Sequence, residues 1–143
     1  DYALEVLQCH CPLMAAACDD NCIVLLNADT YSAVHSFIAH AKPVKCVAFA
    51  SEGKILASGS EDSTVRVWEV GKTMRCVQML WGHQSGVSSV AFLRSQELMT
   101  GSWDDTAKLW LWETGECIVT FVGHTMSVTS AVPSADGGRI VTS

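Results

Sequence analysis

The feature that most constrains this chain is an internal repeat. Three similar stretches, VHSFIAH, VQMLWGH and IVTFVGH, end at His40, His83 and His124. These histidines are 43 and then 41 residues apart. A period of this length is typical of repeat architectures, in which each unit buries its apolar faces by stacking against its neighbours. We therefore expect an array of similar units.

Each unit contains short runs of β-type composition separated by turn residues. In the most complete unit the runs are VKCVAF, KILASG, TVRVWE and RCVQML. Their apolar positions alternate, which is typical of strands with one buried face. The connectors ASEGK and SADGG carry the Gly and Asp that hairpin turns favour. The pattern predicts an all-β chain of four-stranded antiparallel sheets stacked around an axis.

A second pattern recurs in register within the two complete units. A histidine is followed by a hydroxyl residue, then by an aspartate, and then by a tryptophan six residues after the aspartate. One imidazole, one hydroxyl, one carboxylate and one indole N–H can form a chain of hydrogen-bond donors and acceptors. The members are His40, Ser58, Asp62 and Trp68 in one unit and His83, Thr100, Asp104 and Trp110 in the next.

This pattern, with GH before the first strand, resembles the WD-repeat (WD40) β-propeller family over nearly the whole chain. The resemblance implies that the eight residues above are the family's structural tetrads. It also implies a partial propeller over 1–143, with a degenerate repeat 1–39, two complete repeats 40–82 and 83–123, and an incomplete repeat 124–143. A propeller typically has roughly 4 to 8 blades, and this family most often has about seven, so we expect a fragment of a longer chain.

Two units depart from the pattern. In the first, Asp20 is retained, but Ala16 stands at the hydroxyl position and Leu26 at the tryptophan position. We therefore expect this unit to depend on the apolar packing of CIVLL. The last unit begins at His124 and reaches Thr142, which aligns with the hydroxyl position.

The same residue types could also suggest catalysis. Ser58, His40 and Asp62 are the types that a nucleophilic triad uses. A triad is needed once, whereas this set recurs, and the tryptophan recurs with it. The sequence also lacks a strand–G-x-S-x-G–helix elbow and a phosphate-binding glycine loop. We therefore predict no catalytic residues and no enzymatic activity.

The cysteines raise the question of a metal site. Seven cysteines are an odd number in a chain without a visible signal peptide, which favours free thiols over disulfides. In CHCPLMAAACDDNC the possible zinc ligands are Cys9, His10, Cys11, Cys18 and Cys22. Their spacing does not match the paired spacing of zinc ribbons and fingers. We predict no metal and no other cofactor, and interpret these cysteines as small buried apolar residues.

The charge balance narrows the partner class. Nine basic and 15 acidic residues give a formal net charge of -6, and the basic residues form no run. Nucleic acid and anionic membranes attract clustered positive charge, so neither is expected as a partner. No apolar run approaches the roughly 20 residues that cross a bilayer. We expect a cytoplasmic location, with the nucleus possible.

For function, the resemblance implies a scaffold that docks partner proteins or peptides, as a subunit or domain of a larger assembly. The alternative is a regulatory propeller attached to an ATPase or another enzyme in a longer chain. Trp103 is either an exposed anchor for a partner or packed against a neighbouring blade's loop, whereas Trp81 and Trp112 are expected to pack. The positions that match the family's partner-binding face are Asp19, Lys45, Glu61, Ser88, Trp103 and Thr129.

Overall fold

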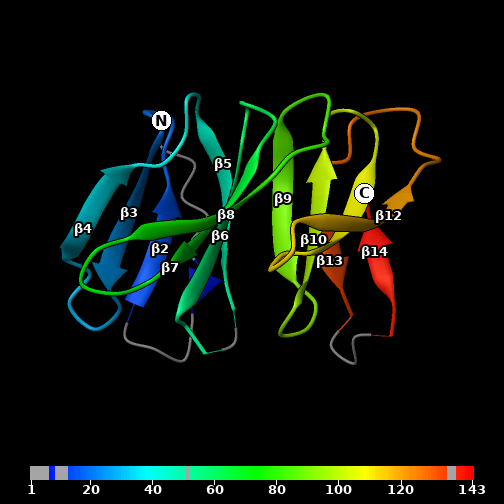
Figure 1. Cartoon of the computed structure of the whole chain (residues 1–143). Helices are drawn as coiled ribbons and strands as arrows, with labels where there is room; N and C mark the ends of the chain where they lie inside the picture. The colour runs from blue at the N-terminus through cyan, green and yellow to red at the C-terminus, as the bar shows by residue number, and fades with distance from the viewer. Residues whose placement is uncertain (1–6, 9–12, 51, 135–137) are drawn as a thin grey trace.

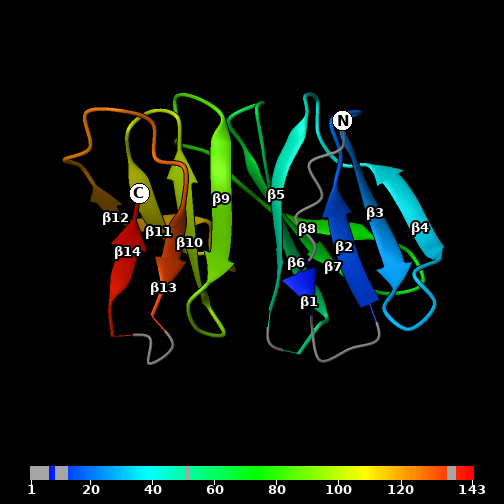
Figure 2. The ribbon, with the colours of Figure 1, turned by 180° about the vertical axis from the view of Figure 1, so that it is seen from behind.

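The fold is a row of antiparallel sheets. A computed structural model describes residues 7–8, 13–50, 52–134 and 138–143. The described residues contain strands and no helix, and therefore no helix able to cross a membrane. Three four-stranded sheets and one two-stranded sheet lie side by side (Figures 1 and 2). The prediction of an all-β chain of four-stranded antiparallel sheets is confirmed.

We call the sheets blades 1 to 4 in chain order. Blade 1 contains β1 (Leu7–Gln8), β2 (Leu13–Ala17), β3 (Cys22–Asn27) and β4 (Ala33–Ile38). Blade 2 contains β5 (Val44–Phe49), β6 (Ile55–Ser60), β7 (Val65–Glu69) and β8 (Arg75–Leu80). Blade 3 contains β9 (Val87–Phe92), β10 (Glu97–Ser102), β11 (Ala107–Leu111) and β12 (Glu116–Phe121). Blade 4 contains β13 (Ala131–Pro133) and β14 (Ile140–Thr142).

The register of the third strand is the same in the first three blades. Trp68 pairs with Leu56 and Trp110 with Leu98, while Leu26 pairs with Met14 at the corresponding place in blade 1. A β-bulge immediately precedes each of the three positions where the third strand pairs with the fourth. Leu26 therefore occupies the position of the two tryptophans, and the bulge does not depend on the indole.

The turn between the second and third strands is also shared. Asn21, Ser63 and Asp105 each follow the aspartate position and have φ of 68°, 70° and 66°. Asparagine and aspartate tolerate this left-handed conformation better than most residues because their short polar side chains can hydrogen-bond locally. Three equivalent turns thus hold three aspartates at the same edge of neighbouring blades.

The hydrophobic core lies between consecutive blades. Trp68 of blade 2 packs edge-on against Phe37 of blade 1, with ring centroids 5.0 Å apart. Trp110 of blade 3 shares a buried cluster with Leu80 of blade 2. Each indole therefore packs on the outer strand of the preceding blade, so neighbouring blades stabilise each other.

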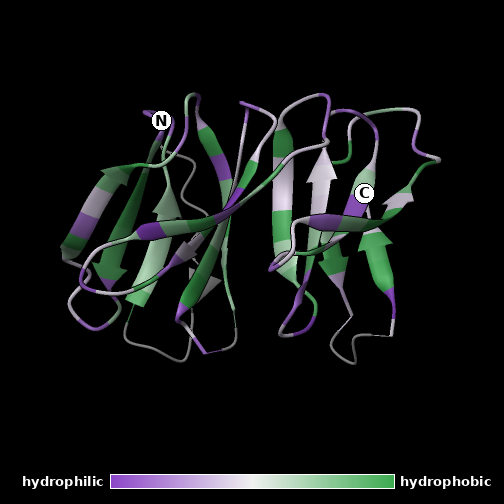
Figure 3. Ribbon diagram, viewed as in Figure 1, coloured by the Kyte–Doolittle hydropathy of each residue, from purple (hydrophilic) through white to green (hydrophobic). Residues whose placement is uncertain are grey.

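Blade 1 lacks an indole at this position and relies on aliphatic packing. Ile23 and Leu25 are 0% and 3% exposed. Figure 3 shows β3 as hydrophobic along most of its length, in contrast to the polar segments within β8 and β12. These observations agree with the expectation that CIVLL packs blade 1.

Candidate functional site

The four types of the repeated pattern meet at one edge of blade 3. His83 Nδ1 lies 2.8 Å from Asp104 Oδ2, and His83 Nε2 lies 2.8 Å from Thr100 Oγ1. Trp110 Nε1 donates to the same Thr100 oxygen at 2.9 Å. The structure therefore joins four residues from the loop, the second strand, the turn and the third strand in one hydrogen-bonded chain.

Blade 2 repeats this arrangement with serine in place of threonine. His40 Nδ1 lies 3.0 Å from Asp62 Oδ2, and its Nε2 lies 2.8 Å from Ser58 Oγ. Trp68 Nε1 donates to Ser58 Oγ at 2.9 Å. The same hydrogen bonds form in two blades that share the same sequence pattern, so we attribute them to that local pattern.

The protonation states follow from burial and hydrogen bonding. Burial lowers the pKa of His83 and outweighs the raising effect of Asp104. Burial alone would raise the pKa of Asp104, but hydrogen bonds from Thr106, Gln84 and His83 lower it from 3.8 to about 2. At neutral pH an ionised Asp104 therefore accepts from the Nδ1–H of a neutral His83, which leaves Nε2 to accept the Thr100 O–H.

Two further hydroxyl positions support the turns. Thr64 and Thr106 Oγ1 donate to the Oδ1 atoms of Asp62 and Asp104, both at 2.6 Å. The four-residue pattern of the sequence includes neither threonine. Both nevertheless stand two residues after their aspartate, so their recurrence was visible in the sequence.

The four-residue pattern also does not include the serines that stand two residues before each of these aspartates. Ser60 Oγ and Ser102 Oγ accept hydrogen bonds from the backbone N–H groups of Asp62 and Asp104, both at 3.1 Å. Ser60 Oγ also donates to the carbonyl of Lys42 at 3.0 Å. The Gly-Ser dipeptide that ends the second strand of blades 2 and 3 carried this signal.

The described residues of blades 1 and 4 show parts of the arrangement. In blade 1 the turn between β2 and β3 is tied to the segment after β4, because the Asn21 carbonyl accepts hydrogen bonds from the backbone N–H groups of Ala39 and His40. In blade 4 His124 Nε2 lies 2.7 Å from Thr142 Oγ1. Thr142 pairs with β13 as Thr100 pairs with β9, in agreement with the predicted alignment.

The hydroxyls of these chains are inaccessible to a substrate. Ser58 and Thr100 are each 0% exposed. Each oxygen already contacts an imidazole nitrogen and an indole N–H. A nucleophile must reach an electrophile outside the protein core, so this geometry suits packing better than acyl transfer.

The residues matched to the partner-binding face lie near the same turns. Lys45 Nζ lies 3.5 Å from Asp19 Oδ1 in blade 1 and 3.4 Å from Glu61 Oε1 in blade 2. The structure thus brings three of the six predicted residues together across the boundary between two blades. The Lys45 ammonium thus contacts one carboxylate from each of the two blades. All three side chains are partly exposed, and ion pairs in such positions contribute little to stability.

The two predicted hydroxyl residues of this face bond within the fold. Ser88 Oγ donates to the carbonyl of Val128, in the segment before β13. Thr129 Oγ1 donates to the carbonyl of Ser143 at 3.1 Å. Ser88 is half-buried and Thr129 is exposed.

Trp103 combines packing with exposure. Its backbone N–H donates to the carbonyl of Gly86 at 2.9 Å, and its indole lies against that glycine. Gly86 belongs to the loop of the same repeat, so this contact lies within blade 3, and the same glycine also lies beside Glu61 of blade 2. The residue nevertheless remains 38% exposed.

The other two tryptophans differ from each other. Trp112 is 9% exposed and its Nε1 donates to the carbonyl of Ser95 at 3.0 Å, in agreement with the expected packing role. Trp81 is 69% exposed, so the expectation that it packs is wrong. It follows β8 and belongs to none of the buried clusters of the described residues.

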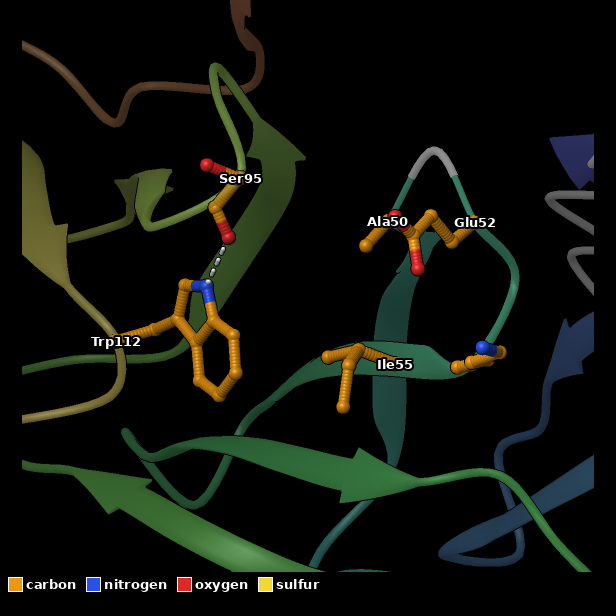
Figure 4. A pocket seen from close by; sticks show the side chains of 6 residues that line it. Ala50, Glu52, Ile55, Ser95 and Trp112 are labelled. Atoms are coloured by element: carbon orange, nitrogen blue, oxygen red, sulfur yellow. Dashed lines mark hydrogen bonds between the residues drawn. The ribbon is translucent and has the colours of Figure 1, made fainter.

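A cavity of 170 Å³ lies between blades 2 and 3. Its lining includes Ala50, Ile55 and Trp112, and the hydrogen bond from Trp112 to Ser95 fixes the indole in place (Figure 4). Apolar atoms dominate this lining, to which Glu52, Lys54 and Ser95 also contribute.

The metal hypothesis receives no support from the part of the chain that the structure describes. Those residues contain no group of three or more His, Cys, Asp or Glu side chains that could hold a metal ion. Cys9, His10 and Cys11 lie outside the described residues. Cys18 and Cys22 are half-buried and not buried as expected, because they flank the turn at the end of blade 1.

Comparison with known proteins gives consistent matches. The WD domain, G-beta repeat family matches residues 31–69, 74–110 and 115–143. Apoptotic protease-activating factor 1 of Rattus norvegicus is 32% identical over 133 residues, which are 93% of this chain and 10% of the relative. Nuclear distribution protein PAC1 of Komagataella phaffii is 27% identical, over 92% of this chain and 30% of the relative. Cell division control protein 4 of Candida albicans is 42% identical over 73 residues, 50% of this chain and 11% of the relative. The chain therefore spans between 10% and 30% of the length of these relatives.

Proposed function

Because the chain belongs to the WD-repeat family, we propose that it is a non-enzymatic scaffold. Its propeller blades would dock partner proteins or peptides on one face and its loops, within a multi-subunit complex. Three of the residues expected on this face, Asp19, Lys45 and Glu61, form an ion-paired row across two blades. Trp103 continues the face into blade 3.

The observation that carries the proposal is the supported, part-exposed indole of Trp103. Exposed aromatic side chains on a rigid support are the residues that most often dominate interface energies. The tetrad residues support a non-enzymatic function, because their polar groups already form hydrogen bonds inside the blades. These contacts support a structural use of the same residue types that an enzyme would need exposed.

The net charge of -6 favours protein partners over nucleic acid. We propose a cytoplasmic or nuclear location, since the relatives matched include a nuclear distribution protein and a cell division control protein.

A second function is supported by the small share of the relatives that the chain covers. The rat relative is named as a factor that activates a protease, and the chain matches 10% of it. A regulatory propeller that controls an enzyme domain in a longer chain would also use a docking face. The two functions differ in whether the bound partner lies in the same polypeptide.

The test is affinity capture with the full-length polypeptide, followed by mass spectrometry of what is retained. Three baits are compared: wild type, Trp103→Ala, and Trp81→Ala as a matched control at an indole that is 69% exposed. The scaffold proposal predicts partners that are lost with Trp103→Ala and kept with Trp81→Ala. Equal retention by all three baits would count against this face as the docking site.

A further inference from the structure

Trp103 and Glu61 approach each other at a single glycine. A Cβ atom added at Gly86 would lie 2.6 Å from Trp103 Cε3 and 3.3 Å from Glu61 Cα. The indole of blade 3 and the turn of blade 2 are therefore separated by about the width of one residue's backbone. Since Trp103 is 38% exposed, the supported indole still presents surface to a ligand.

The turn of blade 2 that approaches this indole belongs to a row of side chains with a net negative charge. The Glu61 side chain is 33% exposed and that of Asp19 is 54% exposed. Lys45 supplies one positive charge against these two carboxylates. The row Asp19–Lys45–Glu61 thus carries one net negative charge, on a molecule whose formal net charge is -6. Such a surface attracts a cation more strongly than a neutral or anionic group.

We propose that Trp103 and Glu61 form a binding site for a basic side chain of a partner segment, an inference that rests on the proposed docking function. An indole attracts a cation through the negative face of its ring. The neighbouring carboxylate supplies the opposite charge. Arginine suits the site best because its planar guanidinium stacks on aromatic rings and donates paired hydrogen bonds to a carboxylate.

Lys45 competes for the carboxylate that the ligand needs. Its Nζ lies 3.4 Å from Glu61 Oε1, so an incoming guanidinium must share or displace this contact. Replacing Lys45 with methionine removes the competing charge and keeps much of the apolar stem. Lys45→Met is therefore expected to tighten binding of a basic ligand, which a purely structural role of Lys45 would not produce.

The experiment uses the full-length polypeptide and a fluorescein-labelled, amidated peptide in which two arginines alternate with alanines. A twin peptide carries citrulline, the neutral analogue of arginine. Fluorescence anisotropy should give a Kd at least about tenfold lower for the arginine peptide. Trp103→Ala should raise that Kd about tenfold, and Glu61→Gln should raise it and weaken its dependence on salt.

Two variants sharpen the result. Gly86→Ala keeps every recognising group but displaces the indole, so it should weaken the arginine peptide as Trp103→Ala does. Trp81→Ala should leave the Kd unchanged. Melting temperatures of all variants separate loss of binding from loss of folding. Equal affinity for the arginine and citrulline peptides, or weaker binding by a folded Lys45→Met protein, overturns the site.

The outcome is separable from that of the proposed function. If Trp103→Ala loses its captured partners while both peptides bind equally, the docking face stands and the basic-side-chain site is overturned. If partner capture is unchanged but the arginine peptide depends on Trp103, the site stands and the docking function of this face fails.

Discussion

At the scale of single residues, Asp104 is the most heavily used acceptor. It accepts hydrogen bonds from the backbone N–H of Gln84 and from both the N–H and the hydroxyl of Thr106, besides its contact with His83. Asp104→Ala leaves these donors without a partner, so it should lower the free energy of unfolding by about 1 to 3 kcal/mol. Chemical denaturation measures the change. Asp20→Ala is the matched control, because Asp20 occupies the corresponding turn of a blade without the hydroxyl and the indole, and it should cost less.

His83→Ala removes the residue between Thr100 and Asp104, and we expect a loss of about 1 to 3 kcal/mol for the same reason. The double variant with Asp104→Ala should lose less than the sum of the two single changes, since they interrupt one chain. A sum that is fully additive would show that the two residues act independently.

The two histidines also predict how stability depends on pH. Burial lowers the pKa of His40 and of His83 in the folded protein. As the pH falls through about 6.5 the unfolded chain binds protons that the folded chain does not. Stability is therefore full above that pH and declines below it. The low pKa of Asp104 adds a further loss between its ordinary 3.8 and about 2.

Urea unfolding at pH 7.5, 6.0 and 5.0 checks this expectation. The midpoint should fall across the series, and His35→Gln, a change at an exposed strand residue, should retain the fall. A midpoint that is constant from pH 7.5 to 5.0 would contradict the assignment of neutral buried histidines.

At the scale of strands, two glycines at the ends of β6 and β10 lie too close to neighbouring side chains to accept a Cβ atom. A Cβ at Gly101 would lie 2.7 Å from Ser89 Oγ and 2.9 Å from Val128 Cγ1, and one at Gly59 would meet Val87 and Cys46 similarly. Gly101→Ala should destabilise by about 1 to 3 kcal/mol because it overpacks the contact between β10 and its neighbours. Gly71→Ala is the control, since its nearest contact would be an ordinary 3.7 Å. Equal melting temperatures for both variants would argue against tight packing at this position.

At the scale of the whole molecule, the blades are expected to unfold together. Leu80 belongs to β8 of blade 2 but is 1% exposed in the cluster that contains Trp110 of blade 3. Leu80→Ala should cost about 2 to 5 kcal/mol. Hydrogen exchange should show lost protection in β10 as well as in β6. Loss confined to blade 2 would indicate that the blades are independent.

The sequence predicted most of what repeats. Strands, the hydrogen-bonded chains around His40 and His83, and the substitution at Leu26 all follow from residue types that recur at fixed spacing. The exposure of Trp81 was not predictable, because an apolar residue type does not reveal whether a neighbouring surface covers it. The ion pairs of Lys45 and the approach of Trp103 to Glu61 could not be predicted from the sequence either, since they depend on how one blade stacks against the next.

The surface around Trp103 cannot be copied onto another blade by introducing a tryptophan alone, because the indole packs against Gly86. The turns of blades 2 and 3 are built alike: the Glu61 N–H donates to the carbonyl of Pro43 as the Trp103 N–H donates to that of Gly86. A tryptophan grafted at position 61 would therefore meet a proline ring where Trp103 meets only hydrogen. An engineered copy of this surface must move both residues, and relatives that vary one of them are expected to vary the other.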